Sequence, residues 1–188
     1  MKKWLFNPFV FVAGTKSLFI GLAVMLVTAI IAIFSTAHFD GVLDMHAGLA
    51  APAAVYFLDQ LNAWGCAVLL FFIAGLIFSA SSVRLIDIAG TMALARWPML
   101  IVSILCFGFN TSAAIRTMND ITPSMIIISL ISIVFTIWMI ALMYNAFRVA
   151  ANVKGGTAIG AFIGALILAE ILSHYLSYQL YRSFHLPL

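Results

Sequence analysis

The stretch TAIGAFIGALILAEILSHYLSYQLYR at residues 157–182 decides the fold of this chain. About 24 of these residues fit on one helix, which is enough to cross a hydrocarbon core of about 30 Å. Inside this predicted span lie Glu170 and His174, which an α-helix places one turn apart on the same face. An ionisable group within a span marks a functional site or a buried polar contact. Both interpretations stay open, the second being a protonated Glu170 hydrogen-bonded to a neighbouring helix.

The composition is that of an integral membrane protein. Hydrophobic residues make up 65% of the 188 residues and charged residues 8%, against about 45–50% and about 25% in soluble domains. The chain is too short for a helix bundle plus a separate soluble domain, so we expect one membrane domain over residues 1–188. Cys66 and Cys106 fall inside apolar runs, where they act as small hydrophobes, and no disulfide framework is implied.

The apolar runs and the breaks between them predict an all-α integral membrane protein with five transmembrane helices. Pro98 and Pro123 favour helix starts, and Gly155-Gly156 forms a turn before the last span. Residues 50–61 are mildly amphipathic and are expected to pack back on the bundle from the outer side. The five predicted spans are residues 18–36, 62–82, 98–114, 123–147 and 157–181.

A short cytoplasmic interfacial helix is predicted before the third span. Arg84, Asp87 and Thr91 recur among apolar residues in the run from 84 to 95, which suits a helix lying along the membrane surface. Proline disfavours a helical residue before it. We therefore expect the helix at 85–95 to turn into the third span at Trp97-Pro98.

The placement of the basic residues predicts the orientation. With a cytoplasmic N-terminus, seven of the nine basic residues lie inside, as the positive-inside rule requires. The seven are Lys2, Lys3, Lys16, Arg84, Arg96, Arg148 and Lys154, and the two outside are Arg116 and Arg182. Five spans then put the C-terminus outside. The basic cytoplasmic edge favours contact with anionic lipid headgroups of the bilayer. The candidate lipid-binding residues are Lys2, Lys3, Arg84 and Arg96. No nucleic-acid partner is expected.

The turn after the first span carries the residue types of a metal site. The run HFDGVLDMH at 38–46 holds two imidazoles and two carboxylates, which are zinc ligands. Because the predicted topology brings this outer turn to the side where Glu170 and His174 lie, the two groups are expected to converge. Gly41 allows a tight fold. The candidate metal ligands are Asp40, Asp44, His46, Glu170, His174 and, less strongly, His38, with zinc as the expected ion. A solvated turn without metal is the alternative.

Three stretches resemble the Yip domain family, the Ypt-interacting proteins, and especially its small bacterial members. They are LFNPF at 5–9, LIDIAGTMALARWP at 85–98 and WMIALMYNAFRVAANVKGGTAIGAFIGALILAEIL at 138–172. With the five spans, the resemblance covers nearly the whole chain. It implies a Yip-like membrane domain in the bacterial inner membrane and, from the eukaryotic branch, a role as a membrane adaptor. The acidic-tyrosine-proline motif of eukaryotic members is missing, which argues against a small-GTPase partner.

Three classes of function remain open. The first is a non-enzymatic membrane-organising or adaptor protein with a metal site on the outer side. The second is a small ion, proton or metal transporter that uses Glu170 and His174, although no inverted repeat supports it. The third is a metal-dependent membrane enzyme. HExxH and GxSxG motifs are absent, and no second carboxylate is expected inside another span, so an enzyme is the less favoured class.

Small residues recur along the last span. Gly160-Ala161, Gly164-Ala165 and Ala169 follow one another at a spacing of about one helical turn. Such spacing permits close contact between helices. The contact is expected within the bundle, with a homo-oligomer formed through the last span as the alternative.

Overall fold

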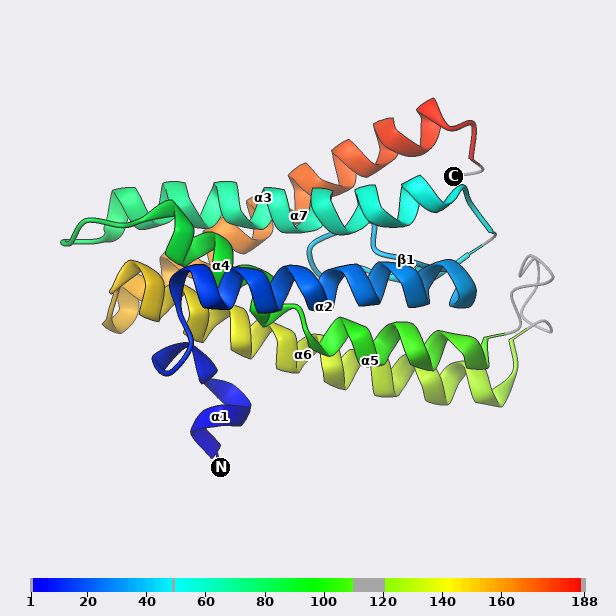
Figure 1. Cartoon of the computed structure of the whole chain (residues 1–188), viewed down its shortest axis with the longest axis horizontal. Helices are drawn as coiled ribbons and strands as arrows, with labels where there is room; N and C mark the ends of the chain where they lie inside the picture. Colours follow the sequence, from blue (N-terminus) through cyan, green and yellow to red (C-terminus); the bar gives the residue numbers. More distant parts are fainter. Residues whose placement is uncertain (1, 49, 110–120, 187–188) are drawn as a thin grey trace.

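A computed structural model describes residues 2–48, 50–109 and 121–186 and shows an elongated helical bundle (Figure 1). In chain order the elements are α1 (Lys2–Phe6), η1 (Pro8–Val10), α2 (Gly14–Ser35), β1 (Ala37–His38), β2 (His46–Ala47), α3 (Ala53–Phe78), α4 (Leu85–Ala95), α5 (Pro98–Leu105), η2 (Cys106–Gly108), α6 (Pro123–Ala151) and α7 (Gly155–Ser183). Five segments are long and apolar enough to cross a membrane: Gly14–Ser35, Ala53–Phe78, Leu85–Gly108, Pro123–Ala151 and Gly155–Ser183. The prediction of an all-α, multi-pass membrane protein is confirmed.

The second span differs from its prediction. Residues 50–61 were expected to form a separate segment, but α3 is one helix from Ala53 to Phe78. The polar residues that gave this stretch its amphipathic pattern do not face water, because Asp59 and Gln60 are both buried in the bundle. No proline interrupts the helix after Pro52, so it runs on through the predicted boundary. For the third span, the predicted end at residue 114 lies outside the described residues.

A separate helix before Pro98 is present, with α4 ending at Ala95 and α5 starting at Pro98. An interfacial position for α4 is not confirmed. Seven of its eleven residues are buried, and it runs beside α2, with Gly90 against the backbone of Gly14 and Leu18. A helix lying flat on a membrane would keep one face free. Together, α4 and α5 belong to one apolar segment, Leu85–Gly108, which is long enough to cross a membrane.

The predicted outer turn is a β-hairpin that folds back into the bundle. Thr36 ends α2 in the left-handed conformation with φ 52°, which reverses the chain, and β1 then pairs antiparallel with β2, Ala37 opposite Ala47. At the tip, Phe39 and Val42 are buried. The tip reaches Glu170, which lies near the middle of the 29-residue helix α7. The turn was expected to be a polar segment outside the membrane; in the structure its tip is instead buried among the helices, and protein groups surround its non-helical backbone.

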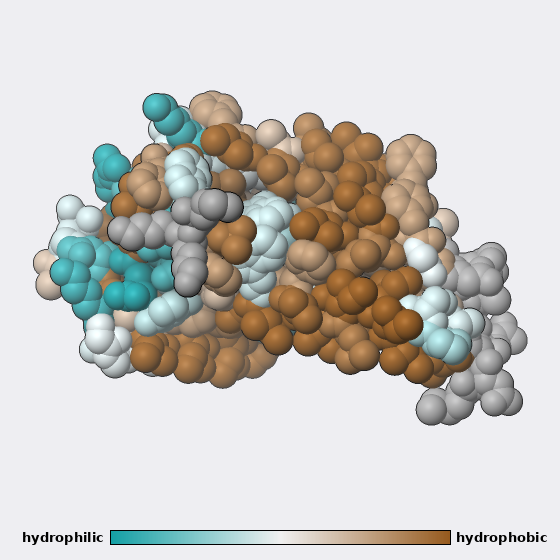
Figure 2. Space-filling view, turned by 90° about the horizontal axis from the view of Figure 1, so that it is seen from below, coloured by the Kyte–Doolittle hydropathy of each residue, from teal (hydrophilic) through white to brown (hydrophobic). Residues whose placement is uncertain are grey.

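The two ends of the bundle differ in polarity. The start of α2, the connection from α3 to α4 and the turn from α6 to α7 lie at one end, at the left in Figure 1. Strongly hydrophilic side chains gather at that end, and a hydrophobic band covers most of the middle of the visible face (Figure 2). From their shared turn, α6 and α7 diverge toward the other end (Figure 1). The hairpin reaches α7 through Glu170 and lies beside α6 at Ser132.

Candidate metal centre

Helix α7 and Arg96, which lies in the turn between α4 and α5, hold the hairpin tip by its backbone. From α7, Ser173 Oγ accepts a hydrogen bond from the Val42 amide at 3.1 Å, and Glu170 Oε2 accepts one from the Leu43 amide at 2.8 Å. From the opposite side, Arg96 Nη1 donates to the Val42 carbonyl at 2.9 Å. A Cβ added to Gly41 would lie 2.5 Å from Glu170 Oε1, so only glycine allows this approach. Because these contacts fix the tip against α7, they also fix where Asp40 and Asp44 lie.

Three of the predicted ligands come together beside the tip. One ligand atom each from Asp40, Asp44 and His174 lies within 4.8 Å of the others. His174 Nε2 is 3.3 Å from Asp44 Oδ2 and 3.4 Å from Glu170 Oε1, and His174 Nδ1 is 4.0 Å from Asp40 Oδ2. Three carboxylates thus surround one imidazole, and a bound divalent cation would offset most of their negative charge.

His46 extends this group on the hairpin. Its Nδ1 lies 3.3 Å from Asp40 Oδ1. Burial is the largest single influence on Asp40 and by itself would raise its pKa. The contact with His46, the charges of His46 and His174 and a backbone hydrogen bond together outweigh burial, so the pKa of Asp40 lies below its ordinary value. The same hydrogen bond raises the pKa of His46. The pair therefore favours an ionised Asp40, which is the form that binds a metal.

The sixth candidate, His38, belongs to a different cluster. Its Nδ1 lies 3.3 Å from Asp59 Oδ2, which also accepts a hydrogen bond from the Tyr181 hydroxyl at 3.0 Å. The ring of His38 stacks on that of His46, with centroids 5.2 Å apart. Asp59 is 1% exposed on α3. It lies before the predicted span 62–82 but inside the apolar segment Ala53–Phe78, so a carboxylate does lie within another candidate span, contrary to our expectation. The signal was the polar run Asp59-Gln60 within an apolar stretch.

The structure changes the set of candidate lipid-binding residues. Arg96 was expected at the cytoplasmic edge, but it is 2% exposed and is enclosed between the hairpin and the helices. Its guanidinium therefore cannot reach headgroups at a membrane surface. Arg84 is exposed and forms a bidentate pair with Asp87, at 2.7 and 3.0 Å. The side chains of Lys2 and Lys3, like Arg116, lie outside the part that the structure describes.

No family model, curated protein or solved structure matches this chain. The class of protein is defined by its own features, namely five apolar segments able to span a membrane and a cluster of ionisable side chains around a buried hairpin.

Proposed function

We propose that the chain is a non-enzymatic integral membrane protein that binds one divalent metal ion, zinc first, between the hairpin and α7. The observation that carries this proposal is the meeting of Asp40, Asp44 and His174 within 4.8 Å. Carboxylate oxygens and an imidazole nitrogen are suitable zinc ligands, and three of them leave a fourth position for Glu170 or water. His46 acts beside the site by keeping Asp40 ionised.

The bound ion would join the hairpin to α7 and so stabilise the buried turn. This structural role fits the membrane-organising or adaptor function that the resemblance to the Yip domain family implies. Transport is the second candidate, since a buried hairpin carrying ionisable groups at mid-helix depth is typical of ion pathways. Glu170 and His174 would then lie on the path of the ion.

We expect the purified protein to bind one zinc ion and the His174→Ala variant to bind zinc at least tenfold more weakly, because it loses the imidazole among the three proposed ligands. The control is His185→Ala, which removes an exposed histidine after α7. Isothermal titration calorimetry in detergent, after chelator treatment and dialysis, measures the zinc affinity of the parent and of the two variants. Binding should weaken on acidification because protons compete for the same ligands.

Parent protein that binds no zinc, or His174→Ala that binds like the parent, would contradict the metal site. The two candidate functions separate in proteoliposomes loaded with a zinc-sensitive dye. Zinc entry that the Glu170→Gln variant loses would favour transport, whereas binding without entry favours the structural role.

We also propose that the protein lies in a bacterial inner membrane with its N-terminus in the cytoplasm. Lys16, Arg84, Arg148 and Lys154 lie near the helix ends at the hydrophilic end of the bundle, which supports this orientation. The first turn of α4 would then meet the cytoplasmic headgroups. The glycines at 160 and 164 on α7 have no described atom within 4 Å of an added Cβ, so a second copy has room to pack there.

Single cysteines at Ser81 and Ser183 test the orientation, because both positions are exposed. Ser81 follows the C-terminal end of α3, and Ser183 is the last residue of α7, at the opposite end of the bundle. In intact cells, a membrane-impermeant maleimide should label Ser183→Cys and should label Ser81→Cys only after lysis. Cys66 and Cys106 are buried and are replaced by alanine as a precaution. Labelling of both positions from the same side would rule out the proposed topology.

A further inference from the structure

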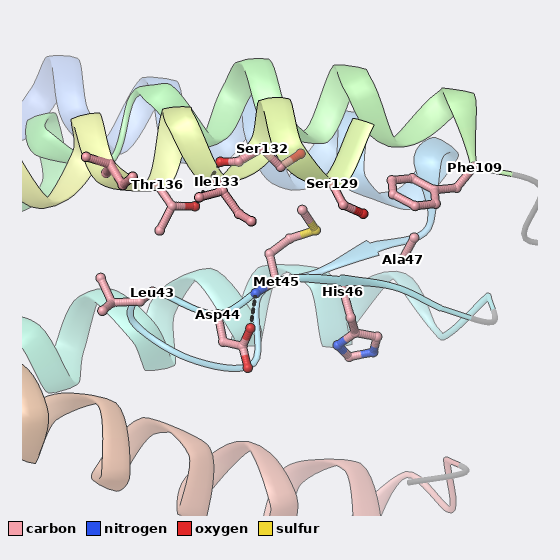
Figure 3. Close-up of a pocket in the computed structure, with 11 residues that line it drawn as sticks. Leu43, Asp44, Met45, His46, Ala47, Phe109, Ser129, Ser132, Ile133 and Thr136 are labelled. Atoms are coloured by element: carbon pink, nitrogen blue, oxygen red, sulfur yellow. Dashed lines mark hydrogen bonds between the residues drawn. The ribbon is translucent and has the colours of Figure 1, made fainter. Parts of the chain in front are cut away.

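A cavity of about 450 Å³ lies between the hairpin and α6. Hairpin residue Met45 faces the hydroxyl-bearing side of α6 across it (Figure 3). Its volume falls in the range of about 300–1,000 Å³ that small-molecule sites occupy. The lining mixes hydroxyls with apolar groups and includes Met45, Ser129, Ser132, Ile133, Thr136 and Ile137. A ligand of this cavity would therefore be amphiphilic.

The position of the cavity indicates that its ligand comes from the bilayer. Ser132 lies nine residues into α6, which is about 14 Å along the helix at about 1.5 Å per residue. The neighbouring turns of α6 carry exposed apolar side chains, among them Leu130 and Val134, the latter 63% exposed. These side chains belong to the hydrophobic segment Pro123–Ala151. An apolar molecule can thus enter between them without crossing water.

The polar groups decide the chemistry of the ligand's head. Ser132 is 6% exposed and its Oγ has no hydrogen-bond partner among the described residues. A hydroxyl held in an apolar region without a partner is costly, and a ligand oxygen would satisfy it. Among the described residues that line the cavity there is no lysine or arginine, and Asp44 is one of them. His46 also lines the cavity but is paired with Asp40 at 3.3 Å, so the carboxylate of Asp44 disfavours an anionic head.

We propose that this cavity binds a single-chain membrane alcohol, with its hydroxyl on Ser132 and its chain along the apolar side of α6. The hydroxyl can both donate and accept, as Ser132 does. Met45, Ile133 and Ile137 contact the chain. Asp44 both lines the cavity and belongs to the proposed metal site, so the cavity is tested with the metal removed.

The test uses the full chain in phosphatidylcholine nanodiscs with chelator and a hexadecanol analogue that carries a diazirine in its chain. Photolabelling should fall on residues 43–47 and 129–137, and unlabelled hexadecanol should compete, whereas palmitic acid should not. Ser132→Ala should weaken competition about five- to tenfold, the worth of one neutral hydrogen bond. The control Val134→Ala, which changes an exposed side chain of the same helix, should leave competition unchanged.

Ser132→Ala should also unfold like the parent, since the hydroxyl has no partner within the described protein to lose. Labelling that hexadecanol does not displace would overturn the proposal. So would equal competition by palmitic acid, or labelling concentrated around Val134, which would indicate ordinary contact with lipid.

Discussion

Gly21→Ala is expected to destabilise the bundle strongly although it adds a single methyl group. A Cβ on Gly21 would lie 2.5 Å from the Leu94 amide nitrogen and 2.6 Å from the Ala93 carbonyl carbon. These are backbone atoms of α4, so relief requires α2 and α4 to separate. Overpacking of this kind costs about 1–3 kcal/mol and occasionally more. This cost outweighs the gain of about 1 kcal/mol that alanine brings to a helix interior.

Gly164→Ala is the matched control, because a Cβ at Gly164 on α7 meets no described atom within 4 Å. It should be neutral or should stabilise the protein by about 0.5–1 kcal/mol, the difference in helix preference alone. The measurement is the fraction of sodium dodecyl sulfate that unfolds each variant in mixed micelles, followed by circular dichroism. Gly21→Ala unfolding at the same fraction as Gly164→Ala would show that the contact between α2 and α4 is looser than described.

Arg96→Leu is expected to be the most destabilising change of a charged residue. Arg96 donates to the Val42 carbonyl at 2.9 Å, and the charge of Glu170 acts on it across the hairpin. Removal of the guanidinium leaves a buried carbonyl without its donor and removes the attraction between its charge and Glu170. Loss of a hydrogen bond from a charged donor costs about 1.5–3 kcal/mol. The hairpin tip would loosen, and zinc affinity should fall with it.

The double variant Arg96→Leu/Glu170→Gln tests the cause. A neutral amide at position 170 still accepts from the Leu43 amide but needs no countercharge, so part of the lost stability should return as a coupling of about 0.5–3 kcal/mol. Arg84→Leu is the control, since Arg84 lies exposed in a surface pair with Asp87 and should change stability little. Strictly additive effects of the two substitutions at 96 and 170 would mean that their charges do not interact.

Much of the fold follows from local pattern. Apolar runs of about 20 residues must form helices in a bilayer, because every backbone amide needs a partner within its own segment. The helix starts at Pro98 and Pro123 follow from proline's fixed φ and missing N–H. The i, i+4 relation of Glu170 and His174 follows from the helical period. The sequence also predicted that the turn at 38–46 would approach these two residues, which lie beside Asp44 and the Leu43 amide.

Tertiary packing decided what surrounds these elements. The pattern of α4 suits a membrane surface, and only the glycine contacts with α2 show that it packs inside the bundle. The burial of Arg96 and Asp59 depends on which helices enclose them, and these helices come from distant parts of the chain. The sequence of the hairpin is that of a solvated turn, but in the folded structure Arg96, Glu170 and Ser173 form hydrogen bonds with its backbone. Local sequence sets backbone conformation and helical period, but the partners that replace water around a polar group come from distant segments, so their positions depend on the folded structure.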